Sequence, residues 1–224
     1  MAVANDPATQ AGEALEELCR RYWPPLYLYV RRKGYDLHDA HDLTQEFFRH
    51  LLQRRDLTLV RREKGRFRSF LLSAFNHFLV SQWRHAGAEK RGGGCTFIQL
   101  EDLLREDRSS QEPFHESTPE RAYERRWAVA LLEQVLTGLR CEYERTGKSE
   151  QFELMKASLC GGESASYGEL ARRLGMSEGA FKVAIYRLRQ RYLALLKQEV
   201  SHTVATVAEV EDELRHLFEV LSAQ

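Results

Sequence analysis

The sequence lacks the usual features of secreted and membrane proteins. It has four cysteines in 224 residues, and none of them form a CxxC pair. The sequence has no basic start followed by an apolar run, as a signal peptide would. It also has no uninterrupted apolar stretch of about 18 residues, the length that a membrane span needs. We therefore expect reduced thiols, a cytoplasmic location and no membrane-spanning segment.

Common catalytic motifs are missing as well. The sequence contains no Walker loop and no GxSxG, and Gly92 to Gly94 come without the strand and lysine of a phosphate loop. One short segment combines histidine and aspartate at a spacing that could bind a metal, as in some phosphohydrolases. Its residues are His38, Asp39, His41 and Asp42. Aspartate is also common as a cap at a helix entrance, and no second cluster matches. We expect no enzyme activity, cofactor or metal, with a metal-dependent phosphohydrolase as a remote alternative.

The chain has no net charge and a pI near 7.1, so it lacks the overall basic excess of many nucleic-acid binders. The charges are unevenly distributed, however. Residues 43–91 carry eleven bases against four acids, and residues 164–198 carry seven against two. Between them, residues 101–124 carry eight acids against three bases, with Pro113 and Pro119 marking a linker. Any binding to nucleic acid must therefore come from two basic regions separated by an acidic segment.

The second basic region has the spacing of a DNA-binding helix-turn-helix. Residues 166–198 read SYGELARRLGMSEGAFKVAIYRLRQRYLALLKQ. Ser166 and Glu169 form a capping box that predicts a helix from about Tyr167, and Gly175 suits the left-handed end of that helix. Ser177 is a good N-cap for a second helix. The sequence therefore predicts a short helix, a glycine turn and a longer helix.

In the longer helix, apolar residues recur at steps of three or four and predict one buried stripe. They are Phe181, Ile185, Leu188, Tyr192 and Leu195. The opposite face carries long hydrogen-bond donors suited to phosphates and guanine edges, as on a recognition helix in the major groove. These are Lys182, Tyr186, Arg187, Arg189 and Arg191. An ordinary amphipathic hairpin with a solvated basic face is the alternative.

The first half of the sequence also predicts helices. A helix around residues 15–22 is expected to be interrupted by Pro24 and Pro25, and a further one is expected to end at Gly34. Residues 36–54 have a wide apolar stripe and a polar side rich in acids. Residues 66–85 interleave aromatics with bases, which suits single-stranded DNA because bases stack on rings while cations follow the phosphates.

Most aromatic side chains of this last segment are expected to be core residues, with a nucleic-acid role reserved for Trp83 and for His77 or Phe78. Its exposed side is expected to offer Arg66 and Arg68 as well. The buried set is expected to include Val80.

Both halves, in this order, resemble the extracytoplasmic-function group of the sigma-70 family over roughly residues 12–198. DAHDLTQEFFRHLL is similar to the helix that docks on the clamp helices of the RNA polymerase beta-prime subunit. GRFRSFLLSAFNHFLVSQWRH is similar to the segment that melts and reads the minus-ten promoter element, and SYGELARRLGMSEGAFKVAIYRLRQRY resembles region 4.2, which reads the minus-thirty-five element. The three motifs in this order, with an acidic linker, are far more specific than any one alone.

The resemblance implies a role for each matching residue. Those facing the polymerase clamp would be Asp39, Asp42, Gln45, Glu46 and Phe48. Those near the melted minus-ten strand would be Arg61, Arg62, Lys64, Arg66, Asn76, Trp83 and Arg84. Those near the upstream duplex would be Ser177, Lys182, Tyr186, Arg187 and Arg189. The implied partners are core RNA polymerase, through its beta-prime and beta subunits, promoter DNA, and an anti-sigma or other inhibitory protein.

The predicted fold is all-α, with two helical domains joined by an acidic linker. Residues 1–92 would form a region 2-like domain, residues 93–125 the linker and residues 126–198 a region 4-like domain. Residues 199–224 extend beyond the family pattern as an amphipathic helix that packs on the second domain or receives a regulatory protein. The expected function is promoter recognition as a sigma factor, without chemistry of its own. The alternative is a helix-turn-helix regulator that binds duplex DNA without polymerase.

Overall fold

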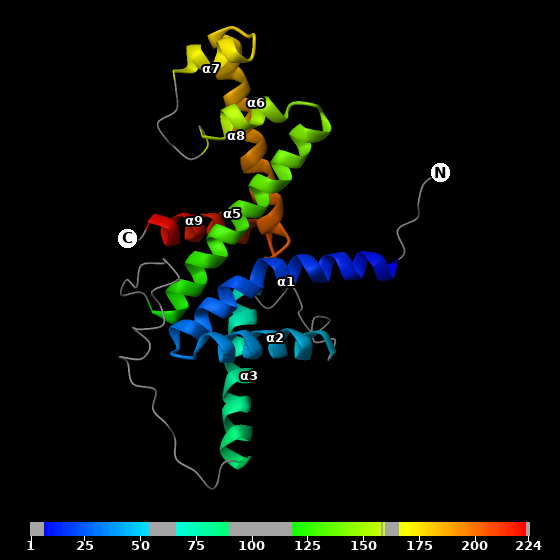
Figure 1. Ribbon diagram of the computed structural model, residues 1–224, viewed down its shortest axis with the longest axis vertical. Coiled ribbons are helices and arrows are strands. Elements are labelled where there is room, and N and C mark those ends of the chain that lie inside the picture. The colour runs from blue at the N-terminus through cyan, green and yellow to red at the C-terminus, as the bar shows by residue number, and fades with distance from the viewer. Residues whose placement is uncertain (1–6, 54–65, 90–117, 158, 160–165, 223–224) are drawn as a thin grey trace.

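The computed structural model describes residues 7–53, 66–89, 118–157, 159 and 166–222, and every regular element in these ranges is a helix (Figure 1). The all-α prediction is confirmed for this part of the chain. The bounds of the helices are α1 Pro7–Arg32, α2 Leu37–Gln53, α3 Phe67–Glu89, α5 Pro119–Arg145, α6 Ser149–Lys156, α7 Tyr167–Arg173, α8 Glu178–Ser201 and α9 Val207–Ser222. None of these helices is both long and apolar enough to cross a membrane.

Helix α1 continues through Pro24 and Pro25, so the predicted interruption is wrong. A proline inside a helix removes one backbone hydrogen bond and favours a kink. The turn after the two prolines places Leu26, Tyr29 and Val30 in the core, each without measurable exposure. Burial of these three side chains favours the helical path that the prolines disfavour locally.

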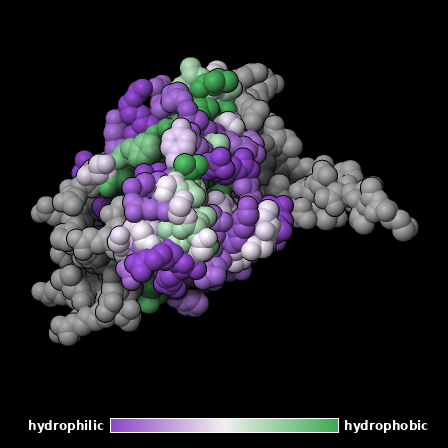
Figure 2. Space-filling model, turned by 90° about the horizontal axis from the view of Figure 1, so that it is seen from above, coloured by the Kyte–Doolittle hydropathy of each residue, from purple (hydrophilic) through white to green (hydrophobic). Residues whose placement is uncertain are grey.

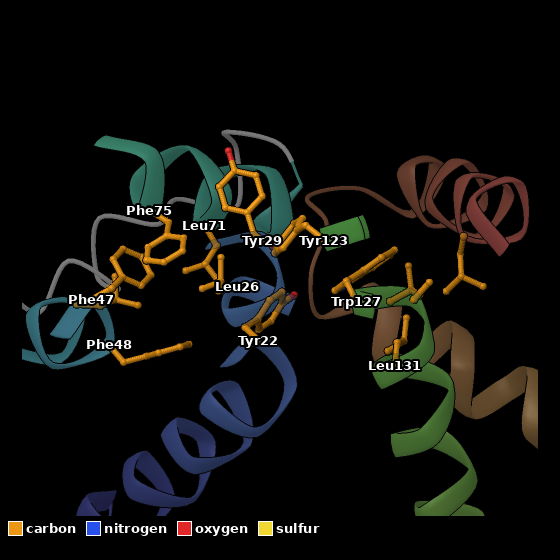
Figure 3. Close-up of a cluster of buried hydrophobic side chains, with 14 of the residues drawn as sticks. Tyr22, Leu26, Tyr29, Phe47, Phe48, Leu71, Phe75, Tyr123, Trp127 and Leu131 are labelled. Carbon is orange, nitrogen blue, oxygen red and sulfur yellow. The ribbon is translucent and has the colours of Figure 1, made fainter. Parts of the chain in front are cut away.

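The main core gathers side chains from most of the described helices. Tyr22, Leu26 and Tyr29 of α1 meet aromatic and aliphatic residues of α2 and α3 on one side and of α5 on the other (Figure 3). Trp127 of α5 is buried in this core, and α8 and α9 complete it. Segments far apart in the sequence therefore share one hydrophobic interior.

A second, smaller core lies under the helix-turn-helix. Leu139 of α5 and Phe152 of α6 pack there with Phe181, Ile185 and Leu188 of α8. The prediction that these three α8 residues are buried is confirmed. Helix α5 contributes to both cores and runs from the side of α1 toward α6 (Figure 1). Its N-terminal part, from Pro119, falls within the segment predicted as the linker.

The C-terminal helix α9 packs into the main core through Val210, Leu214 and Leu217, as expected from its amphipathic pattern. Phe218, placed on the same side in the prediction, is 51% exposed. Helix α9 contacts α5 and α8, and its buried side also carries an acid, Glu213. The C-terminal extension is therefore an integral part of the fold.

Candidate nucleic-acid interface

The turn between α7 and α8 is built as a helix-turn-helix requires. Gly175 has a φ of 65°, a left-handed conformation that residues with a side chain rarely adopt. Ser177 caps α8, because its hydroxyl accepts a hydrogen bond from the Ala180 N–H at 3.2 Å. Helix α7 begins at Tyr167 as predicted, but the hydroxyl of Ser166 makes no capping hydrogen bond. The turn thus depends on Gly175 and Ser177 more than on the predicted capping box.

The outer face of α8 is exposed and basic. Tyr186 is 63% exposed, and Lys182, Arg187 and Arg189 are exposed beside it. The ammonium of Lys182 lies 2.6 Å from Glu178 one turn earlier, and this pairing raises the pKa of the lysine. The predicted reading face is therefore presented to solvent, with the Ser177 hydroxyl already used by the helix cap.

Arg191, predicted on the same face, pairs with a residue of another helix. Its guanidinium donates to the carboxylate of Glu142 on α5, with Nε 2.9 Å from Oε2. The hydrogen bond from Arg191 holds the pKa of Glu142 below its usual value. Arg191 therefore fixes α8 against α5 and does not belong to the open basic face.

A shallow hollow of about 580 Å³ adjoins the same face, between α5, α6 and the start of α8. Arg187 and Val183 line it from α8, and Tyr143 and Lys148 line it from the α5–α6 side. Figure 2 views this end of the molecule and shows a mostly hydrophilic surface with scattered apolar patches. Arg187 thus borders both the reading face and the hollow.

The predicted polymerase-facing residues on α2 separate into two groups. Asp39, Asp42 and Gln45 are exposed, and Glu46 is half-buried and paired with Arg49. Phe48 is only 5% exposed and belongs to the main core, so its placement on the contact surface is corrected. The apolar stripe of α2 is wide enough to turn Phe47 and Phe48 inward together.

The predicted minus-ten residues are less open than the basic face of α8. Asn76 accepts a hydrogen bond from the Tyr29 hydroxyl at 2.8 Å, and Arg66 lies 2.9 Å from Glu213 of α9. Trp83 of α3 is 70% exposed, and His77 of the same helix is also exposed. The side chain of Arg84 and the whole of Arg61, Arg62 and Lys64 lie outside the described residues. Val80, expected to be buried, is 48% exposed.

Arg68 is buried, contrary to the prediction that it lies on the exposed side of α3. Its side chain is 4% exposed, its Nε donates to Glu213 at 2.6 Å, and its Nη1 donates to Glu124 at 2.7 Å. The guanidinium also lies 4.9 Å from the ring centre of Trp127. Arg68 therefore joins α3 to α5 and α9.

The electrostatics of this cluster keep it ionised. Burial by itself lowers the pKa of Arg68, but the carboxylates of Glu213 and Glu124 raise it overall, so the guanidinium remains charged. Burial raises the pKa of the neighbouring Tyr22 hydroxyl to about 12. The cluster is thus a charged arginine held by two carboxylates beside the neutral phenol of Tyr22.

A second polar cluster joins α1, α5 and α8. Arg21 donates to Gln134 at 2.7 Å and also to Glu199, which accepts a further hydrogen bond from Gln134 at 3.3 Å. The side chain of Arg21 is only 8% exposed. Together with the Arg68 cluster, it ties helices from both ends of the sequence into one body.

The histidine and aspartate segment of α2 forms an exposed cluster without metal-site geometry. The Nδ1 atoms of His38 and His41 lie 4.0 Å and 3.6 Å from carboxylate oxygens of Asp42, and the His41 ring packs edge-on against Trp23. Asp36 caps the helix by accepting from the Asp39 N–H at 2.7 Å. Over the residues that the structure describes, no group of three or more suitable ligands is placed to hold a metal ion.

Sequence reasoning missed Glu213 and Glu124 as partners of the α3 arginines. One signal for Glu213 was present, because it lies three residues after Val210 and four before Leu217, on the apolar stripe of α9. An acid on such a stripe must be paired if the helix is buried. No comparable signal distinguishes Glu124 from the other acids around it.

Comparisons of the chain with known protein families, with characterised proteins and with solved structures found no match.

Proposed function

We propose that this chain is a sigma factor of the extracytoplasmic-function type, which binds core RNA polymerase and directs it to promoters. The observation that carries the proposal is the exposed basic face of α8 behind a glycine turn and a serine cap, the arrangement of a recognition helix. Lys182, Tyr186, Arg187 and Arg189 would contact the upstream duplex. Arginine at such a position can bind a guanine edge through two hydrogen bonds.

The first half of the chain supplies the other contacts of this proposal. Asp39, Asp42 and Gln45 of α2 would face the polymerase clamp, with Glu46 at their edge. Trp83 of α3 would stack on a base of the melted strand, because a tryptophan that is 70% exposed is available for such a contact. The part of the predicted acidic linker that precedes α5 would connect the two DNA-reading parts. Spacing between the promoter elements would be set by the polymerase.

The test is transcription in vitro with core polymerase on a library of bacterial genomic fragments, followed by sequencing of the transcript starts. We expect core polymerase and the protein together to give defined starts that share two upstream sequence elements. Core polymerase alone gives the background. Tight, specific duplex binding by the isolated protein, with no polymerase-dependent starts, would instead establish the stand-alone regulator.

Two sets of variants assign the contacts. Arg187→Ala is expected to weaken upstream recognition by about 1 to 3 kcal/mol if the side chain makes a bidentate base contact. Arg20→Ala, which removes an exposed arginine of α1, is its matched control. Asp39→Ala with Asp42→Ala should reduce polymerase binding without loss of helix content, whereas Phe48→Ala would disturb the core. If neither the arginine nor the aspartate variants alter transcription, the proposal fails.

A further inference from the structure

Glu213 of α9 pairs with Arg66, just before α3, and with Arg68 in the first turn of α3. Its Oε1 accepts from Arg68 Nε at 2.6 Å, and its Oε2 lies 2.9 Å from Arg66 Nε. The carboxylate side chain is 1% exposed. Glu213 lies 145 positions after Arg68 in the sequence. The contact is therefore a tertiary one that joins the C-terminal extension to the segment proposed to bind the melted strand.

The chemistry of this contact is that of phosphate recognition. A guanidinium binds a carboxylate and a phosphate through the same charge-assisted hydrogen bonds. Glu213 bridges the guanidinium of Arg66, just before α3, and that of Arg68 in its first turn, as a backbone phosphate of a DNA strand would. While α9 is in place, neither arginine can offer these donors to DNA.

Other contacts cover the same part of α3. The Phe67 N–H donates to the Thr203 carbonyl between α8 and α9 at 3.0 Å, and the Tyr123 hydroxyl of α5 donates to the Arg68 carbonyl at 2.9 Å. Tyr29 holds the amide of Asn76. Trp83, farther along α3, remains exposed. These contacts therefore cover the N-terminal end of α3, which we call its base, and leave Trp83 nearer the C-terminal end exposed.

The ion pairs of Glu213 contribute little net free energy to the docking of α9. Burial of charged groups carries a desolvation cost that their mutual attraction only roughly offsets. The docking of α9 therefore depends on its apolar contacts, chiefly Val210, Leu214 and Leu217, together with the full set of ion pairs. A polyanionic strand that pairs with Arg66 and Arg68 would compete directly with Glu213.

We propose that α9 is an autoinhibitory element, which withholds the base of α3 from single-stranded nucleic acid until Glu213 leaves Arg66 and Arg68. The proposal rests on the proposed function, because it assumes that α3 binds the melted strand. Release separates α9 from the start of α3 and frees the guanidinium groups of Arg66 and Arg68 from Glu213, about 22 Å along α3 from the open Trp83. The competent state is then a minor population, and apparent affinity for a strand falls in proportion to that population.

The test compares the full-length Glu213→Gln variant with wild type and with Glu219→Gln, which removes an exposed acid of the same helix. Binding of a fluorescein-labelled single-stranded DNA of random sequence is followed by anisotropy, and hydrogen exchange of the α9 amides reports release. Glutamine keeps the size and one acceptor of the side chain while removing its charge. We expect faster α9 exchange and about tenfold tighter binding for Glu213→Gln. Glu219→Gln should match wild type in both.

Leu217→Ala provides a second route, because it loosens α9 without touching an ion pair. It should also speed α9 exchange and tighten binding, and it decides the matter if Glu213→Gln does not fold. Faster α9 exchange without tighter binding overturns the proposal. So does unchanged α9 exchange in both folded variants.

Failure of the inference and failure of the proposed function give different results. The sigma proposal fails if core polymerase yields no defined transcript starts with wild type or with Glu213→Gln. The inference fails if the variants bind single-stranded DNA no better than wild type, whatever the polymerase assay shows. Strand binding that improves without polymerase-dependent starts would support autoinhibition of a nucleic-acid binder that is not a sigma factor.

Discussion

Arg66 and Arg68 are two residues apart, yet they experience different environments. Arg68 enters the main core, where Glu213, Glu124 and the Trp127 ring surround its guanidinium. Arg66 remains about one third exposed and pairs with Glu213. Arg68 lies in the first turn of α3 whereas Arg66 precedes the helix, so the backbone directs the two side chains differently.

The energetic weight of Arg68 can be measured by its removal. Arg68→Ala leaves the Glu213 and Glu124 carboxylates short of a partner in a buried site, so we expect the free energy of unfolding to fall by about 3 to 5 kcal/mol. Urea unfolding followed by far-UV circular dichroism gives this value. Arg215→Ala, which removes an exposed arginine paired with Asp212 on α9, should leave the midpoint unchanged. Equal midpoints for the two variants would show that the buried cluster contributes little.

At the level of the helices, the turn between α7 and α8 sets the position of the basic face of α8. Gly175 ends α7 with a φ of 65°, and a Cβ there would meet no neighbouring atom. The constraint at this glycine is therefore backbone strain and not lack of space. Gly179, in the first turn of α8, also has open space but ordinary helical geometry.

The two glycines should respond to alanine in opposite directions. Gly175→Ala is expected to lower stability by about 1 kcal/mol, because an L-residue is strained in the left-handed region. Gly179→Ala is expected to raise it by about 0.5 kcal/mol through helix propensity. Thermal unfolding measured by circular dichroism distinguishes them. A stabilising Gly175→Ala would mean that the turn does not need a left-handed residue.

The Glu142–Arg191 pair that joins α5 to α8 gives a pH-dependent contribution. Because the folded state lowers the pKa of Glu142, its contribution is present above the unfolded value of 4.5 and is lost as pH falls through the folded value. Wild type should exceed Glu142→Gln in stability by less than about 1 kcal/mol at neutral pH, since the pair is partly exposed. The difference should shrink as pH falls below 4.5 and vanish once pH is below the folded pKa of Glu142. Urea midpoints measured across this range test it, and a difference that grows toward low pH would contradict the assignment.

At the scale of the whole molecule, α5 makes the two cores depend on each other. Leu131 lies in the main core and Leu139, two turns later on the same helix, lies in the core under the helix-turn-helix. Arg21 adds a polar link from α1 to α5 and α8. Because α5 contributes side chains to both cores, its unfolding removes contacts from both, and the stabilities of the two cores are coupled.

We therefore expect one cooperative unfolding transition for the described fold. Leu139→Ala should cost about 2 to 5 kcal/mol, as for other buried leucines. It should lower the midpoint seen by tryptophan fluorescence, although Trp127 lies in the other core. Leu131→Ala, within the Trp127 core, is the matched comparison. If Leu139→Ala shifted the circular dichroism transition but left the fluorescence midpoint unchanged, the two cores would be independent.

Local signals in the sequence were sufficient for α7, α8 and the turn between them. The apolar spacing of Phe181, Ile185 and Leu188, the glycine at 175 and the serine cap at 177 all depend on neighbours within a few residues. Periodicity likewise predicted the buried face of α9. The prediction failed at Pro24 and Pro25, where packing of the next turn outweighs the local preference of proline.

Short-range periodicity and capping account for the helical character of the described residues, the basic face of α8 and the exposed acids of α2. Only the tertiary structure decided that Phe48 and Arg68 are buried and that α5 joins two cores. It also brought Glu213 to Arg66 and Arg68. Such choices depend on which helices meet, and the free energy of burying a charge beside its partner cannot be read from either residue's own neighbours.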